Sequence, residues 1–116
     1  KERARAILAK AGITLMDCPL SGTGAQARAK DLLVYASGPK AAFDQCAAIF
    51  PGFSKGHYYL GAIGNGSKMK YIANHLVAIH NVAAGEAMTL ASKAGLDLQQ
   101  VLDVVAGGAG GSRMFQ

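Results

Sequence analysis

The first half of the chain alternates between helical and extended patterns of apolar side chains. Short apolar runs bounded by Gly, Pro or Asp predict three strands, the first of them buried, at residues 13–16, 31–38 and 57–61. Helical spacing occurs at residues 1–12 and 39–50, and an Ala-rich helix or turn is expected at residues 24–31. The resulting order of helix, strand, turn, strand, helix and strand is typical of an α/β sheet.

The pattern changes after Gly66. Residues 67–93 can form one helix, roughly 40 Å long at about 1.5 Å per residue, with Gly95 as its stop. This helix is apolar around its circumference, which indicates a place inside a larger helical domain or a dimer interface. Asp97 is expected to cap a further helix. We therefore predict an α/β part, residues 1–62, followed by an all-α part, residues 63–116.

Composition excludes several classes of protein. The 116 residues are 51% hydrophobic and 16% charged, which indicates a globular chain. The net charge is +5, yet no run of basic residues exceeds a pair, so we expect no nucleic-acid partner. The sequence shows neither a signal peptide nor an apolar run that could span a membrane, and a cytoplasmic protein is expected. Both ends interrupt patterned segments, so we expect a fragment of a longer protein.

Residues with metal-binding or nucleophilic potential do not form a recognisable pattern. The cysteines, Cys18 and Cys46, fit neither a metal site nor a disulfide framework, which favours a reducing compartment. His57, His75 and His80 share no metal spacing and are expected in the core or at an interface. No metal is predicted.

The glycine-rich loop at residues 61–66 precedes the long helix. It is not a phosphate-binding P-loop, because Ser67 follows Gly66 where a lysine is required. It is not a dinucleotide fingerprint either, since Met69 occupies the position of the third glycine. Taken alone, the loop favours a flexible connection between the sheet and the helix over a ligand-binding loop.

Lys70 lies one turn into the predicted long helix. At about 100° per residue, Asn74 and Asn81 fall within about 40° of Lys70, so one Lys and two Asn form a polar stripe. The positive end of the helix dipole favours a neutral amine, which can donate and accept protons near neutral pH. The alternative is a solvated lysine with two amides packed against neighbouring helices.

A second polar cluster follows the first predicted strand. Ligands of open α/β sheets bind beyond the carboxyl ends of strands. Ser21 offers a hydroxyl there, and Gly22 and Gly24 would let an anion approach the backbone N–H groups. A simple turn with Ser21 as a helix cap remains the alternative.

Both clusters resemble motifs of the β-hydroxyacid dehydrogenases, the family of 3-hydroxyisobutyrate dehydrogenase and tartronate semialdehyde reductase, with 6-phosphogluconate dehydrogenase more distant. The pattern D-x-P-x-S-G-G is matched by Asp17, Pro19, Ser21 and Gly22, with Thr23 in place of the last glycine. The pattern G-x-x-G-x-G-x-x-x-K-x-x-x-N is matched in full by Gly61, Gly64, Gly66, Lys70 and Asn74. The resemblance covers essentially the whole chain.

The resemblance implies an NAD- or NADP-dependent oxidoreductase that interconverts a small β-hydroxyacid and its semialdehyde or keto acid. Lys70 would be the general acid/base, and Asn74 would help to hold the substrate. Ser21, Gly22 and Thr23 would bind the substrate carboxylate, and Thr23 would suit a four-carbon polyhydroxy acid. A non-catalytic relative that serves as an interaction or oligomerisation module is the alternative, although such relatives usually lose the lysine.

The resemblance also implies an architecture. The chain would comprise the C-terminal part of a Rossmann-type domain and the first helices of a helical dimerisation domain, and the long helix would form a homo-oligomer. The glycine fingerprint that grips the cofactor would lie outside these residues. Residues 1–116 alone would then neither bind the dinucleotide tightly nor turn over substrate.

Overall fold

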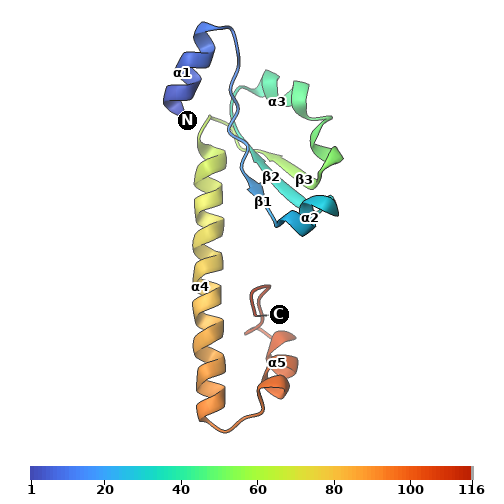
Figure 1. The fold of residues 1–116 in the computed structure, drawn as a ribbon, viewed down its shortest axis with the longest axis vertical. Coiled ribbons are helices and arrows are strands. Elements are labelled where there is room, and N and C mark those ends of the chain that lie inside the picture. The colour runs from blue at the N-terminus through green and yellow to red at the C-terminus, as the bar shows by residue number, and fades with distance from the viewer. Residues whose placement is uncertain (116) are drawn as a thin grey trace. The chain divides into compact units, whose positions relative to one another are not determined.

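A computed structural model describes residues 1–115, which divide into two compact units at residues 72 and 73 (Figure 1). The first unit holds α1 (Glu2–Lys10), β1 (Leu20–Ser21), α2 (Gly24–Arg28), β2 (Leu32–Ala36), α3 (Lys40–Cys46), a 3₁₀ turn (Phe50–Gly52) and β3 (Ser54–Tyr59). Helix α4 (Asn65–Lys93) begins in this unit and continues in the second, which also contains α5 (Leu98–Ala106). The predicted succession of an α/β part and helices is therefore observed, while a domain boundary at residues 62 and 63 stays a prediction.

The three strands lie side by side in the order β1, β2, β3 (Figure 1). Strand β2 pairs antiparallel with β1, where Leu20 faces Val34, and parallel with β3. As the central strand it carries the core, because the side chains of Val34 and Ala36 are fully buried. Phe50 completes this buried cluster, against which pack Met16, Cys18, Phe43, Cys46 and Phe53.

The prediction of a buried strand at residues 13–16 is wrong. Asp17 forms an isolated antiparallel bridge with Ser37, in the same register that pairs Leu20 with Val34. In that register residues 13–16 would lie opposite residues 38–41, where Pro39 has already ended β2 and α3 has begun. The segment therefore has no strand to pair with among residues 1–115, and Ile13 is 54% exposed.

Most other predicted elements of the first unit are confirmed with shifted ends. Helix α1, helix α2 and strand β2 lie within their predicted ranges. Helix α3 stops at Cys46, before the expected end at Phe50, because the chain turns into the 3₁₀ segment that contains Pro51. Strand β3 starts at Ser54, earlier than predicted, since the parallel register with β2 begins there.

The two helices predicted after Gly66 are confirmed, and α4 begins at Asn65, two residues before its predicted start. Gly95 follows α4 with a φ of +75°, a conformation that glycine adopts without strain. The side chain of Asp97 accepts a hydrogen bond from the backbone N–H of Gln100 at 2.8 Å and so caps α5. Several large apolar side chains of α4 remain exposed, among them Ile72, Leu76, Val77, Ile79, Val82 and Leu90. Among residues 1–115, no helix combines the length and apolar character needed to cross a membrane.

Candidate functional site

The two sequence motifs meet at the N-terminus of α4. Asp17, from the first motif, is only 1% exposed, and its Oδ2 accepts a hydrogen bond from the backbone N–H of Ser67 at 2.8 Å. Its Oδ1 accepts a second bond from the Ser67 hydroxyl at 3.0 Å and forms an ion pair with the Lys1 ammonium. The buried carboxylate is therefore fully engaged by protein groups.

The environment of Asp17 favours its ionised form. Burial by itself raises the pKa of this carboxyl group. The hydrogen bonds from Lys1 and from the N–H and hydroxyl of Ser67 outweigh burial, and the pKa lies below its ordinary value. Asp17 thus places a negative charge at the positive end of the α4 dipole, which is a stabilising arrangement.

Ser37 joins the end of β2 to the same helix terminus. Its fully buried hydroxyl oxygen accepts a hydrogen bond from the backbone N–H of Gly66 at 2.9 Å. The hydroxyl also lies 3.2 Å from the backbone oxygen of Asp17, to which it donates. The sequence patterns did not identify Ser37, because its role arises only from the approach of the loop that precedes α4.

Gly66 allows this close approach. A Cβ atom at this position would lie 2.3 Å from the backbone oxygen of Tyr35 and 2.7 Å from that of Asp17. Neither backbone oxygen can move without disturbing the sheet, so no residue with a side chain fits here. Gly61 and Gly64 have φ values of +78° and +94°, which other residues rarely adopt. The glycines of the second motif therefore serve the junction between the sheet and α4.

Lys70 lies on α4 one turn beyond Gly66 and is half-buried. Within residues 1–115, its ammonium has neither a hydrogen bond nor an ion pair with another side chain. Asn74 follows one turn later on the same helix and is exposed, as is Asn81. The two amide side chains are thus exposed to solvent in the described part of the chain.

The other predicted substrate residues surround the start of α2. Ser21 is half-buried in β1. Gly22 has a φ of +135°, and a Cβ atom there would lie 2.4 Å from the Leu32 side chain. Thr23, and not Ser21, caps α2.

Thr23 and Gln26 form a reciprocal capping box. The Thr23 hydroxyl accepts from the backbone N–H of Gln26 at 3.3 Å, and the Gln26 side chain accepts from the backbone N–H of Thr23 at 2.9 Å. An anion at this turn would have to displace Gln26 before it reached the Thr23 amide. The Thr23 hydroxyl proton remains free to donate, because its bond within the box uses only the oxygen as an acceptor.

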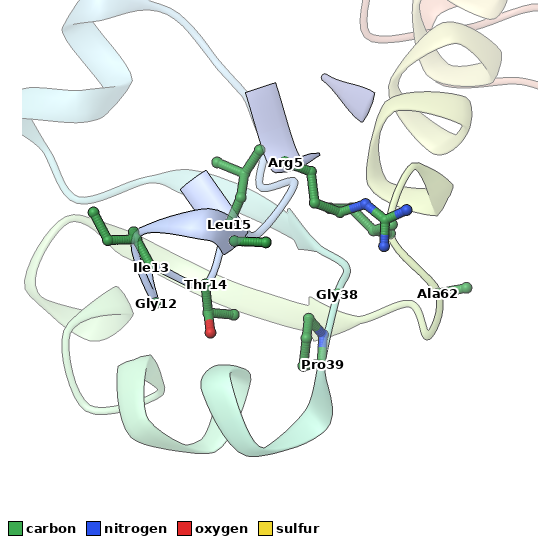
Figure 2. A pocket seen from close by; sticks show the side chains of 10 residues that line it. Arg5, Gly12, Ile13, Thr14, Leu15, Gly38, Pro39 and Ala62 are labelled. Atoms are coloured by element: carbon green, nitrogen blue, oxygen red, sulfur yellow. The ribbon is translucent and has the colours of Figure 1, made fainter. Parts of the chain in front are cut away.

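A pocket of about 590 Å³ lies elsewhere in the first unit, between α1 and the segment at residues 12–15 (Figure 2). Its walls are Arg5, Ala9, Gly12, Ile13, Thr14, Leu15, Gly38, Pro39, Ala62 and Ile63. The Arg5 guanidinium is paired with Glu2 at 2.8 Å. None of the predicted site residues lines this pocket, and its side chains suggest no chemistry.

The cysteines and histidines show no catalytic arrangement. Burial raises the pKa of the Cys18 thiol, which makes it a poor nucleophile. The ring of His57 lies 5.2 Å from that of Phe50, as expected for a core histidine, whereas His75 and His80 are exposed. No group of three or more potential metal ligands occurs within residues 1–115.

Comparisons with known proteins cover the whole chain. A family profile described as the NAD binding domain of 6-phosphogluconate dehydrogenase matches residues 1–64. A second profile, described as NAD-binding of NADP-dependent 3-hydroxyisobutyrate dehydrogenase, matches residues 64–116. The two profiles meet at Gly64, in the loop that joins the sheet to α4.

Individual proteins agree with these profiles. L-threonate dehydrogenase of Haemophilus influenzae is 38% identical over 94% of this chain, a match that covers 36% of that protein. A crystal structure of 3-hydroxyisobutyrate dehydrogenase from Salmonella typhimurium shares 35% identity and a TM-score of 0.86 over 97% of this chain and 40% of that one. The structure of Psf3 in complex with NADP⁺ and 2-OPP shares 26% identity and a TM-score of 0.88 over 98% and 40%. The chain therefore spans little more than a third of the length of this L-threonate dehydrogenase.

Proposed function

The chain belongs to the β-hydroxyacid dehydrogenase family, and from this premise we propose that it supplies the proton-transfer site of an NAD- or NADP-dependent oxidoreductase. The enzyme would interconvert a small hydroxyacid and the corresponding semialdehyde or keto acid. The observation that carries this proposal is the half-buried Lys70, whose ammonium has no protein partner within residues 1–115.

Oxidation of an alcohol to a carbonyl requires that the hydroxyl proton leave and that the carbon give up a hydride, which the oxidised dinucleotide would accept when bound. A neutral Lys70 amine would accept this proton as a general base, and its ammonium would return a proton to the carbonyl oxygen in the reverse direction. Lysine suits this exchange better than arginine, which remains protonated in proteins.

We infer that Gly66 does not contribute a backbone contact to the dinucleotide. The N–H of Gly66 already donates to Ser37, and the backbone oxygens of Tyr35 and Asp17 cover its Cα. A pyrophosphate therefore cannot approach the backbone N–H of Gly66. We expect the glycine fingerprint that grips the pyrophosphate to lie outside these residues.

For the substrate, we assign the carboxylate to Ser21, Gly22 and Thr23, with Asn74 as a further contact. The half-buried Ser21 hydroxyl is the principal donor, because Gln26 occupies the Thr23 amide. The free proton of the Thr23 hydroxyl suits a substrate rich in hydroxyl groups. Together with the similarity to L-threonate dehydrogenase, this favours a four-carbon polyhydroxy acid.

For the assembly, we propose that the exposed apolar side chains of α4 are covered by further helices of a C-terminal domain and by a second copy of the protein. Ile72, Leu76 and Ile79 share one face of the helix and would otherwise expose a contiguous apolar surface. The first unit would correspond to the end of a Rossmann-type domain. The protein would then be a homo-oligomer through α4.

The experiment is an assay of the enzyme that contains this chain, with a panel of hydroxyacids and both dinucleotides, monitored by formation of reduced cofactor. Turnover of a four-carbon polyhydroxy acid, abolished by Lys70→Ala, is expected. A folded oligomer that turns over no member of the panel would instead favour a non-catalytic interaction module.

A further inference from the structure

The N-terminus of α4 lacks a cap from its own sequence. The residue before the helix is Gly64, which has no side chain, and the first N–H groups of a helix have no partner within the helix. Two side chains from the sheet supply the missing acceptors instead. The Ser37 hydroxyl accepts from Gly66, and the Asp17 carboxylate accepts from Ser67.

Asp17 cannot contact a substrate directly. Its side chain has no exposed surface, and its two oxygens are occupied by Ser67 and Lys1. An acidic residue at this position of a substrate-binding motif therefore acts through its protein partners. Asp17 thus holds the start of α4. Lys70 follows Ser67 by one turn on the same side of this helix.

We propose that Asp17 and Ser37 are positioning residues for Lys70: by capping consecutive N–H groups of α4, they fix the rotation and depth of its first turn. The two bonds hold adjacent residues of the helix at different points of the sheet, so the first turn can neither rotate nor slide. The close contact of Gly66 with the backbone of Tyr35 removes the remaining freedom. This inference rests on the proposed role of Lys70.

A double-mutant cycle in the full-length enzyme tests the proposal. Asp17→Asn retains the shape of the side chain and removes the charge that Ser67 and Lys1 engage. We expect kcat to fall at least about tenfold, because misplacement of a catalytic group by about 1 Å can cost about a hundredfold. In the Lys70→Ala background the same change is expected to lower kcat less than about twofold, since residues that act as a unit are not additive.

Ser54→Ala is the matched control. Ser54 is buried and donates one hydrogen bond to the backbone oxygen of Phe50 at 2.8 Å, away from α4. This variant should lower the melting temperature without lowering kcat. If Ser54→Ala lowered kcat as much as Asp17→Asn does, general destabilisation would explain both losses and the proposal would be overturned.

The outcomes separate this inference from the proposed function. If Lys70→Ala alone leaves kcat unchanged, the proposed function is wrong. If Lys70→Ala abolishes most of the activity but Asp17→Asn lowers kcat equally in both backgrounds, Asp17 acts independently and the positioning role is wrong. Should Asp17→Asn fail to fold, Ser37→Ala takes its place in the cycle, with the same non-additive result expected and an additive one contradicting it.

Discussion

The backbone N–H of Ser67 donates to the Asp17 carboxylate at 2.8 Å, although 50 residues separate the two in the chain. This bond joins the motif assigned to substrate binding with the motif that contains Lys70. Asp17 and the first turn of α4 are therefore joined within residues 1–72, and a change in either is expected to affect the other.

Two substitutions of Lys70 distinguish a general acid/base role from a purely structural role of this side chain. Lys70→Ala should lower kcat by about 10²–10⁴, the usual contribution of a general acid/base. Lys70→Arg should not restore activity, because the guanidinium cannot release its proton near neutral pH. Steady-state kinetics of both folded variants checks this. Near-normal kcat for Lys70→Arg would show that the lysine has a structural role.

Replacement of Ser21 tests the carboxylate site. Ser21→Ala should raise KM for the hydroxyacid roughly tenfold to a hundredfold, since a hydrogen bond to a charged group contributes about 1.5–3 kcal/mol. KM for the dinucleotide should stay nearly constant. Ser92→Ala, at an exposed position of α4, is the control and should change neither constant. A selective rise in the dinucleotide KM would assign Ser21 to the cofactor instead.

The ionisation of Asp17 predicts a pH dependence of stability. The pKa of Asp17 is lower in the folded protein than in the unfolded chain, where it is about 3.9. Its contribution to the free energy of unfolding is therefore complete above about pH 3.9 and is lost as the pH falls through the folded pKa. Urea unfolding at a series of pH values should show that the difference between the native protein and Asp17→Asn shrinks in acid. A difference that stays constant from pH 7 to pH 2 would contradict an ionised, hydrogen-bonded carboxylate.

Gly66→Ala should destabilise the first unit, because its Cβ would overlap the backbone oxygens of Tyr35 and Asp17. Such overpacking costs about 1–3 kcal/mol or more in unfolding free energy. Gly52→Ala is the control, since a Cβ there meets no atom within 4 Å. The midpoint of denaturant unfolding reports both effects, and equal midpoints for the two variants would argue against the close approach.

Gln26→Ala should open the capping box at Thr23. The loss of the bond to the Thr23 amide is expected to lower unfolding free energy by about 1 kcal/mol. It also frees that amide for an anion, so KM for the hydroxyacid should stay the same or fall. A clear rise in this KM would mean that Gln26 itself contacts the substrate.

Local patterns were sufficient for the elements whose partners lie nearby. Strand β2 followed from the apolar run closed by Gly38 and Pro39, and α5 followed from the cap at Asp97. The segment at residues 13–16 was mispredicted because an apolar run does not reveal whether a strand lies opposite it. That depends on the register with β2, which only the folded chain defines.

The same limit applies to the candidate site. Lys70 and Ser21 were found from motif spacing, and their proposed roles follow from the family. Gln26 was missed although Thr23-x-x-Gln26 fits a capping box, a pattern that was readable in the sequence. No sequence pattern marked Ser37, because its hydroxyl accepts the hydrogen bond from Gly66 only when the folded chain brings Gly66 to the end of β2.

The caps of α4 also bear on the order in which the chain folds. Their acceptors, Asp17 and Ser37, come together only when the two residues pair across the sheet. We therefore expect the first turn of α4 to dock only after Asp17 and Ser37 have paired. Weakening these caps should accelerate unfolding and leave the refolding rate almost unchanged, which stopped-flow measurements on Asp17→Asn would reveal. Residues important for the proposed catalysis would then govern how long the folded enzyme persists, and not how fast it forms.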